Sequence, residues 1–176
     1  DHVVVWQDSV KDGSGYGIYG QRYSADDQAL GGEFRVNSYI ATDQKTPQVT
    51  ALSTGGFVVT WMSRGQDGSY EGVYSQRYNA AGVTVGNEFR VNQTTASSQF
   101  SPTISGLADG GFVVMWHSIP QDGSGYGIFG QRYDSDGNTA GGEFQANTYT
   151  TADQNYCTVA ALADGGFVAT WNSSGQ

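Results

Sequence analysis

Three things are scarce in this 176-residue sequence: cysteine, basic side chains and long apolar runs. The one cysteine, Cys157, cannot form a disulfide within the chain, so no internal disulfide framework is expected. Eight Lys and Arg face 17 Asp and Glu, a net charge of −9, which opposes binding to nucleic acid or to an anionic lipid surface. No apolar run approaches the roughly 18 residues of a membrane span, and we predict no membrane insertion.

Lys, Leu and Ile are also few, whereas glycine and aromatic residues are abundant. The chain holds 26 Gly, 11 Tyr, eight Phe and four Trp. Aromatic residues favour strands, and glycine favours the tight turns between them. This composition predicts an all-β protein with almost no helix.

The chain is a tandem repeat. Four tryptophans, Trp6, Trp61, Trp116 and Trp171, lie 55 residues apart, and a Gln-Arg-Tyr triplet recurs in the same register at 21–23, 76–78 and 131–133. We predict a single repeat domain, 1–176, with repeats 2–56, 57–111 and 112–166 and a partial fourth repeat, 167–176. Because the chain starts and stops in mid-unit, we expect a processed product or a piece of a longer array.

Cys157 stands where the other two repeats have Pro47 and Pro102. Residues shared by all copies are explained first by the architecture, and a residue that replaces proline in one copy is explained first by drift. We therefore assign Cys157 neither a redox nor a catalytic role.

Each repeat contains four runs that resemble strands. In the middle copy they are 57–63, 72–78, 87–92 and 102–107, with turn-forming residues between them. Short links join antiparallel neighbours, so the unit is expected to be a four-stranded meander. In the first run Phe57, Val59 and Trp61 alternate with Val58 and Thr60, and neither face is strongly polar.

A small sheet covered on both faces is typical of a blade in a β-propeller, which is the predicted fold; a β-trefoil is the alternative. Three blades are too few for an ordinary ring. The C-terminal strands could complete a blade with the N-terminal hairpins, two chains could form a homo-oligomer by strand addition or ring completion, or the protein has more repeats. The sequence leaves these alternatives open.

The recurring segments 108–116, 121–133 and 141–144 together resemble repeats of very large secreted bacterial proteins of the RTX-like or adhesin type. Such repeats accompany calcium-binding nonapeptide and cadherin-like modules. The resemblance covers nearly the whole chain and implies an extracellular or cell-surface location and an adhesive role. It implies no catalytic residues.

Two acidic patterns are candidate calcium ligands. The loops that begin at Asp12, Asp67 and Asp122 offer one carboxylate each, and Asp134 with Asp136 approaches the alternating acidic pattern of calcium loops in one repeat. The simpler interpretation is that these Asp and Gly residues form turns. No cofactor is therefore assigned, and Ca²⁺ is the one that the sequence admits.

A recurring arginine and a recurring glutamate, 11 residues apart, are expected to form a cross-strand ion pair in each repeat. A ligand-anchoring role is the less favoured interpretation, because a structural pair explains why every copy keeps both partners. The pairs are Arg22 with Glu33, Arg77 with Glu88, and Arg132 with Glu143.

Aromatic side chains beside Asn, Gln and Asp are the usual means of binding sugars. Trp61 and Trp116 end apolar strands and are assigned to the core. The candidate ligand-binding residues are loop aromatics: Tyr16, Tyr70, Tyr126, Tyr39 and Tyr149.

Catalytic patterns are lacking. His2 and His117 occupy unrelated positions of the repeat, and no nucleophile has a visible base. A glycosidase-type carboxylate pair, which assembles in space, stays open. We predict no enzyme but a non-catalytic extracellular recognition or adhesion module for a glycan or surface polysaccharide. The alternative is a structural spacer or assembly subunit of a bacterial surface layer or filament, and a polysaccharide-active enzyme is less favoured.

Overall fold

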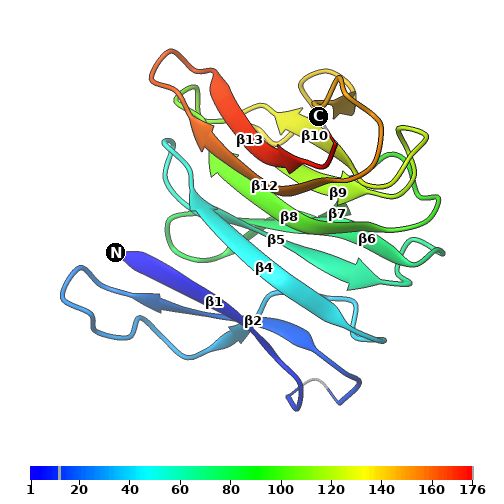
Figure 1. The fold of residues 1–176 in the computed structure, drawn as a ribbon. Helices are drawn as coiled ribbons and strands as arrows, with labels where there is room; N and C mark the ends of the chain where they lie inside the picture. Colours follow the sequence, from blue (N-terminus) through cyan, green and yellow to red (C-terminus); the bar gives the residue numbers. More distant parts are fainter. Residues whose placement is uncertain (12, 176) are drawn as a thin grey trace.

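The computed structural model describes residues 1–11 and 13–175, which form 13 β-strands and no helix (Figure 1). Every pair of neighbouring strands is antiparallel, and each sheet follows the chain order. The all-β prediction and the antiparallel meander are therefore confirmed. None of the described residues lies in a helix that could cross a membrane.

The strands form four separate sheets. The first sheet contains β1 (His2–Asp8), β2 (Gly17–Tyr23) and β3 (Phe34–Arg35). The second contains β4 (Gln44–Ala51), β5 (Phe57–Arg64), β6 (Glu71–Tyr78) and β7 (Thr84–Arg90). The third contains β8 (Gln99–Gly106), β9 (Phe112–Ser118), β10 (Gly127–Tyr133) and β11 (Phe144–Gln145). The fourth contains only β12 (Gln154–Ala161) and β13 (Phe167–Ser173).

The sheets are out of phase with the sequence repeat. The run predicted at 102–107 corresponds to β8, and β8 pairs with β9 of the next repeat instead of with β7. The tight turn at 107–111 explains this, because Leu107 and Gly111 close it by a backbone hydrogen bond and place β8 and β9 edge to edge. The second, third and fourth sheets thus begin on the strand before the tryptophan strand, and the first begins on the tryptophan strand itself.

The sheets stack in chain order, with the first and the fourth at opposite sides of the molecule (Figure 1). Strands β4, β8 and β12 each begin a sheet and contact one another in sequence, so we call them the inner strands. Strand β13 pairs with β12 and has no hydrogen-bonded contact with the N-terminal sheet among the described residues. Ring closure by the two chain ends therefore does not occur within the chain.

Stacking explains why neither face of the tryptophan strand is polar. One face of each sheet, which we call its leading face, packs on the preceding sheet, and the other, its trailing face, packs on the following sheet. Trp61 and Trp116 belong to leading faces, and both side chains are 0% exposed, as predicted. The same geometry recurs in detail: Phe57 stacks on Tyr78, and Phe112 on Tyr133, each at 4.6 Å between ring centroids.

A buried amide network fixes the connection into each inner strand. Asn92 accepts a hydrogen bond from the Val73 N–H at 2.8 Å and donates to the Thr94 carbonyl and to Gln99 Oε1. Asn37 with Gln44 and Asn147 with Gln154 repeat the arrangement. Since each buried amide is satisfied, the network holds the start of every inner strand in one position.

The predicted Arg–Glu pairs are wrong, because Arg22 and Arg77 bind the next sheet and Arg132 forms an ion pair with Asp109 of its own sheet. Arg22 donates to the carbonyls of Ala80 and Ala81 in the turn between β6 and β7. Arg77 donates in the same way to Ser135 and Asp136. A guanidinium can hold two adjacent carbonyls with its parallel N–H groups, so the repeated arginine joins successive sheets.

The repeated glutamates also join sheets. Glu88 accepts from the backbone N–H of Ser38 at 2.6 Å, and Glu143 accepts from that of Gln93 at 2.6 Å. In the first sheet Glu33 instead forms an ion pair with Lys11. The cross-strand pairing prediction is wrong because Glu88 and Glu143 bind the segment that links the preceding sheet to their own sheet.

Candidate functional site

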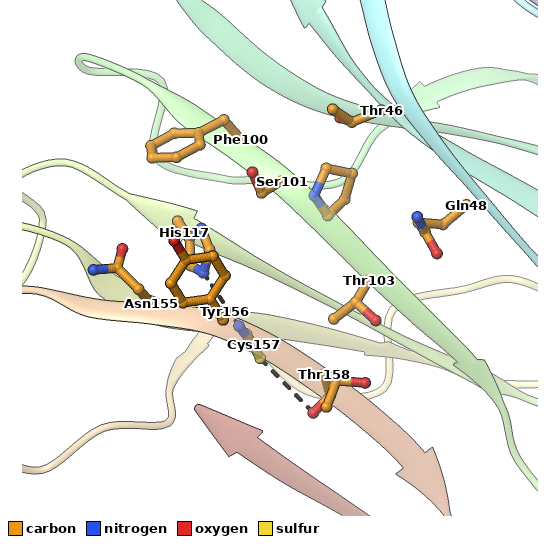
Figure 2. Close-up of a pocket in the computed structure, with 11 residues that line it drawn as sticks. Thr46, Gln48, Phe100, Ser101, Thr103, His117, Asn155, Tyr156, Cys157 and Thr158 are labelled. Atoms are coloured by element: carbon orange, nitrogen blue, oxygen red, sulfur yellow. Dashed lines mark hydrogen bonds between the residues drawn. The ribbon is translucent and has the colours of Figure 1, made fainter. Parts of the chain in front are cut away.

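A cavity of about 500 Å³ lies where the inner strands begin. Its walls come from β4, β8 and β12, with one residue from β9 (Figure 2). We call it the axial pocket; it is lined by Thr46, Gln48, Phe100, Ser101, Pro102, Thr103, His117, Asn155, Tyr156, Cys157 and Thr158.

Each inner strand carries a β-bulge in the wall of this pocket. The pairing register shifts between Lys45 and Gln48 and at the equivalent places in β8 and β12. The bulged residues Thr46, Ser101 and Tyr156 have positive φ angles of 54°, 50° and 58°. A left-handed conformation costs a non-glycine residue about 1 kcal/mol or more, and bulges serve to re-aim side chains. The cost recurs three times beside the same cavity.

Side chains of the tryptophan strands hold the bulges from the preceding sheet. Gln7 Oε1 accepts the Thr46 N–H at 2.8 Å, and His117 Nε2 accepts the Cys157 N–H at 3.4 Å. Gln7 and His117 occupy the same position of the repeat, where the middle copy has Met62. The anchoring position is thus shared, but its chemistry differs in every copy.

The copies differ most where they line the axial pocket. The bulged position is Thr46, Ser101 or Tyr156. The preceding position is Phe100 or Asn155 in the pocket wall, and Lys45, in the first copy, lies outside the lining. Two positions after the bulged residue stands Gln48, Thr103 or Thr158. The backbone conformation recurs in all three copies, whereas most of the side chains at these positions differ. The three inner strands therefore contribute different chemical groups to the pocket.

His117 is the one histidine in the pocket wall, and it is 6% exposed. Burial lowers the pKa of its imidazole, which is therefore neutral near pH 7. Since Nε2 accepts the Cys157 N–H, the proton lies on Nδ1, and Nδ1 has no hydrogen-bond partner in the described part of the chain. Burial also raises the pKa of the neighbouring Cys157 thiol to about 12, so this cysteine is not a nucleophile at neutral pH.

Aromatic rings border the pocket on the β8 and β12 sides. Phe100 makes edge contacts with His117 and with Tyr126, each at 5.4 Å between centroids. Tyr156 lines the pocket yet is 79% exposed, so its ring stands at the pocket mouth. A bulky residue with positive φ is uncommon, and Tyr156 is the largest of the three bulged residues.

The predicted ligand-binding tyrosines do not form one site. Tyr126 is not in the pocket lining but contacts Phe100, which is. The Tyr16 ring packs against Lys45, whose Nζ lies 4.5 Å from the ring centroid. Tyr39 and Tyr149 are half-buried outside the pocket lining, and the Tyr149 hydroxyl donates to the Gly175 carbonyl.

Tyr70 is not equivalent to Tyr16 and Tyr126. It is 64% exposed and stands at the repeat position of Gly15 and Gly125. Its loop is held differently: Asp43 and Asp153 accept the N–H groups of Tyr16 and Tyr126, whereas Ser98 in the middle copy donates to Glu71. The loop therefore has one structure in the first and third copies, which carry Tyr16 and Tyr126, and another in the middle copy, which carries Tyr70.

The predicted calcium ligands act as turn residues. Asp67 and Asp122 each accept a backbone N–H two residues later, and Asp122 also accepts from Asn147. Asp134 accepts both the N–H and the side-chain amide of Asn138, and these hydrogen bonds lower its pKa. The Asp136 carbonyl binds Arg77. Asp12 lies outside the described residues.

No group of three or more His, Cys, Asp or Glu side chains within 1–11 and 13–175 could hold a metal ion. The two candidate patterns lie in separate loops: in the third sheet Asp122 precedes β10, whereas Asp134 and Asp136 follow it.

Sequence reasoning missed Tyr156, Phe100 and most of the other pocket residues. A signal was present: the first residue of each inner strand is glutamine in all three copies, whereas the next two positions, 45–46, 100–101 and 155–156, differ between copies. The residues that the repeats share build the strands and turns, and the positions at which the repeats differ line the pocket.

Comparisons with known proteins bear on the fold. No family model and no curated protein matches the chain. A solved structure with a similar fold is that of an endo-arabinase from Bacteroides thetaiotaomicron VPI-5482, with a TM-score of 0.56 and 13% sequence identity. The match covers 99% of this chain and 66% of the arabinase chain, so this chain spans just under two thirds of the arabinase's length. At this identity the likeness shows the fold alone.

Proposed function

We propose that this protein is a non-catalytic carbohydrate-recognition module that binds a glycan in the axial pocket. The observation that carries the proposal is Tyr156, an aromatic ring that is 79% exposed and held at positive φ at the mouth of the pocket. An exposed aromatic face is what stacks on the apolar face of a pyranose or furanose ring. The backbone cost at Tyr156 is explained if the bulge aims this ring at a ligand.

Polar side chains surround the ring. Gln48 and Asn155 offer amides, and Thr46, Ser101 and Thr103 offer hydroxyls along the pocket walls (Figure 2). These groups both donate and accept hydrogen bonds, as sugar hydroxyls do. The lining contains no Asp, Glu, Lys or Arg among the described residues, which favours a neutral ligand over a charged one.

The lack of carboxylates also supports binding over catalysis. Glycoside hydrolysis ordinarily requires two carboxyl groups about 5 to 9.5 Å apart across the scissile bond. His117 is neutral and buried, and the Cys157 thiol stays protonated, so neither provides an activated nucleophile. The endo-arabinase likeness is therefore a reason to test arabinan as a ligand, not as a substrate.

We also propose that the sheets are consecutive blades of a β-propeller whose axis runs along the inner strands. Face-to-face stacking of four-stranded meanders supports this more than a trefoil does, since the described strands form four separate sheets. The axial pocket would then lie at one end of the central channel, a common place for ligand sites in closed repeats.

We place the protein outside the cell or on its surface, in an adhesive role. The support is the resemblance of its repeats to secreted adhesin-type proteins, together with the acidic composition. The alternative is a structural spacer or an assembly subunit of a surface layer or filament.

A glycan array that includes arabinan, read with added calcium and with EDTA, tests the function. We expect binding of a neutral glycan, confirmed by calorimetry, and loss of at least about tenfold in affinity for Tyr156→Ala, since an aromatic–sugar contact of about 1.4 kcal/mol corresponds to tenfold. Tyr70→Ala is the matched control, because Tyr70 is exposed but lies outside the pocket. No binding across the array, or equal loss in both variants, would reject the axial pocket as the site.

A further inference from the structure

The residue after the bulge distinguishes β12 from the other two inner strands. In β4 and β8 the bulged residue is followed by a proline, Pro47 or Pro102, whose ring fixes φ and which has no N–H. In β12 the bulged residue is Tyr156, and Cys157 follows it. The third bulge therefore lacks the covalent restraint of the other two, and it has a backbone N–H that they do not have.

This additional N–H is bound by His117. The Nε2 atom of His117, on β9 of the preceding sheet, accepts the Cys157 N–H at 3.4 Å. A proline at 157 would place a ring carbon where this hydrogen lies, in overlap with the imidazole. The middle copy combines Met62 with Pro102, and the third copy combines His117 with Cys157. The two replacements in the third copy therefore belong together.

We propose that His117 is a positioning residue of the axial pocket. Through the Cys157 N–H it holds the bulge that presents the Tyr156 ring, and it does so only while its imidazole is neutral. This inference rests on the proposed function, because it concerns the geometry of the same glycan site. The backbone N–H of Cys157 carries the effect, and the thiol has no part in it.

The hydrogen bond matters because the Tyr156 backbone is strained. Its φ is 58°, in the left-handed region that bulky residues avoid, and such a conformation persists only where the surrounding structure fixes it. Without His117 as acceptor, the described residues provide this bulge with neither a proline ring nor a side-chain acceptor. Tyr156 then returns to ordinary strand conformation. Because side chains alternate between the faces of a regular strand, its ring turns away from the pocket mouth.

Protonation of His117 removes the acceptor. The imidazolium carries an N–H on both nitrogens, so Nε2 would point a donor at the Cys157 N–H, which is also a donor. Burial lowers the pKa of the imidazole below the ordinary value of about 6.5, so the acceptor is present at pH 7 and is lost only in acid. We therefore expect the Tyr156 ring to be presented at neutral pH and withdrawn below the pKa of His117.

Few titratable groups face His117. Strand β12 presents the Cys157 thiol and the Tyr156 hydroxyl, and a thiol and a phenol are neutral in acid. Strand β13 carries no titratable side chain. The other strands around the imidazole present groups that do not titrate: Phe100 from β8, Ile128 from β10, and Thr46 and Gln48 from β4. Charged side chains at this end are engaged elsewhere: Asp122 with Asn147, Asp153 with the Tyr126 N–H, and Lys45 with Asp43. Among the described residues that line the pocket, His117 is thus the one whose charge changes in acid.

The first measurement needs no glycan. Nuclear magnetic resonance spectra of the full chain should show the His117 imidazole and the Cys157 amide changing with the same pH midpoint, below about 6.5. In His117→Gln the Cys157 amide should not change over this range. A glutamine oxygen accepts without titrating, as Gln7 does for the Thr46 N–H at 2.8 Å. A wild-type Cys157 amide that ignores the His117 midpoint would overturn the proposal.

The second measurement is binding to the neutral glycans of the array, arabinan included, with affinities from calorimetry. It compares pH 7.5 with one pH unit below the His117 midpoint, where about one molecule in eleven keeps a neutral imidazole, so the wild-type affinity should fall about tenfold. For His117→Gln the ratio of the two affinities should stay near one. The double variant His117→Met with Cys157→Pro, which copies Met62 and Pro102, should also give a ratio near one. Cys157→Ser keeps its N–H and should keep the tenfold ratio.

The outcomes separate two failures. Equal wild-type affinities at both pH values, a tenfold fall that persists in His117→Gln, or a Cys157→Ser variant without pH dependence would each overturn the role of His117 and leave the proposed function standing. A wild-type protein that binds no glycan of the array at pH 7.5 would reject the proposed function, and with it the role of His117 in binding.

Discussion

The two ends of the inner strands follow opposite rules. Where β4, β8 and β12 end, the copies present similar small or aliphatic residues, for example Ala51, Gly106 and Ala161 at one position. Where they begin, the copies present Thr46, Ser101 and Tyr156, with bulges and positive φ. Where the inner strands end, their backbones lie close together, so only small side chains fit at positions such as Gly106. The other end keeps the backbone conformation and varies the side chains, so the copies differ at the pocket end and agree at the hairpin end.

The largest test of this contrast is the core between sheets. Trp116 is fully buried on the leading face of the third sheet, so Trp116→Ala should lower the free energy of unfolding by ~3–5 kcal/mol in chemical denaturation. Trp171→Ala should cost less, because Trp171 is only half-buried and covers one face of a two-stranded sheet. Equal losses would show that burial between two complete sheets is not what stabilises the repeat.

The second test is the close approach at the hairpin end. A Cβ on Gly106 would lie 2.2 Å from the Ala51 carbonyl oxygen, a backbone atom that moves only if β4 and β8 separate. Gly106→Ala should therefore destabilise the protein by about 1–3 kcal/mol, measured by its unfolding midpoint in urea. Gly142→Ala is the control, because nothing lies within 4 Å of its Cβ position. A neutral Gly106→Ala would mean that the inner strands are not tightly packed there.

The same contrast explains what the sequence could predict. The burial of Trp61 and the positions of the glycine turns could be predicted, because strand periodicity and turn formation depend on residues that are close in the sequence. The partners of Arg77 and Glu88 were not, because both reach into a neighbouring sheet, and their positions depend on how the sheets stack. Tyr156 was missed for a related reason: a bulge in a paired strand has no simple sequence pattern, and the exposure of the Tyr156 side chain depends on how the inner strands pack.

The third test separates stability from binding at the pocket end. Tyr156→Gly removes the cost of a positive φ, so it should stabilise the fold by up to about 1 kcal/mol while abolishing glycan binding. Tyr156→Ala keeps the positive φ and should lose binding without that gain. Thermal unfolding and calorimetric titration of both variants decide the matter. If Tyr156→Gly were less stable than Tyr156→Ala, the bulge would be a structural need and not a device for aiming the ring.

The smallest expected effect is a pH dependence that originates in one copy of the repeat. Burial lowers the pKa of His117 below the ordinary value of about 6.5, so the folded protein resists protonation that the unfolded chain accepts. The unfolded state then binds more protons as the pH falls through about 6.5, and stability decreases from pH 7.5 to 5.5 by less than ~1.4 kcal/mol per pH unit. His117→Gln places the side chain of Gln7 at the equivalent position and removes the titrating group. The unfolding free energy of the variant should lose this slope, whereas His2→Gln, at an exposed site, should keep it. If the unfolding free energy of His117→Gln kept the same dependence on pH, another group would be its source, and the His117 imidazole would not titrate between pH 7.5 and 5.5.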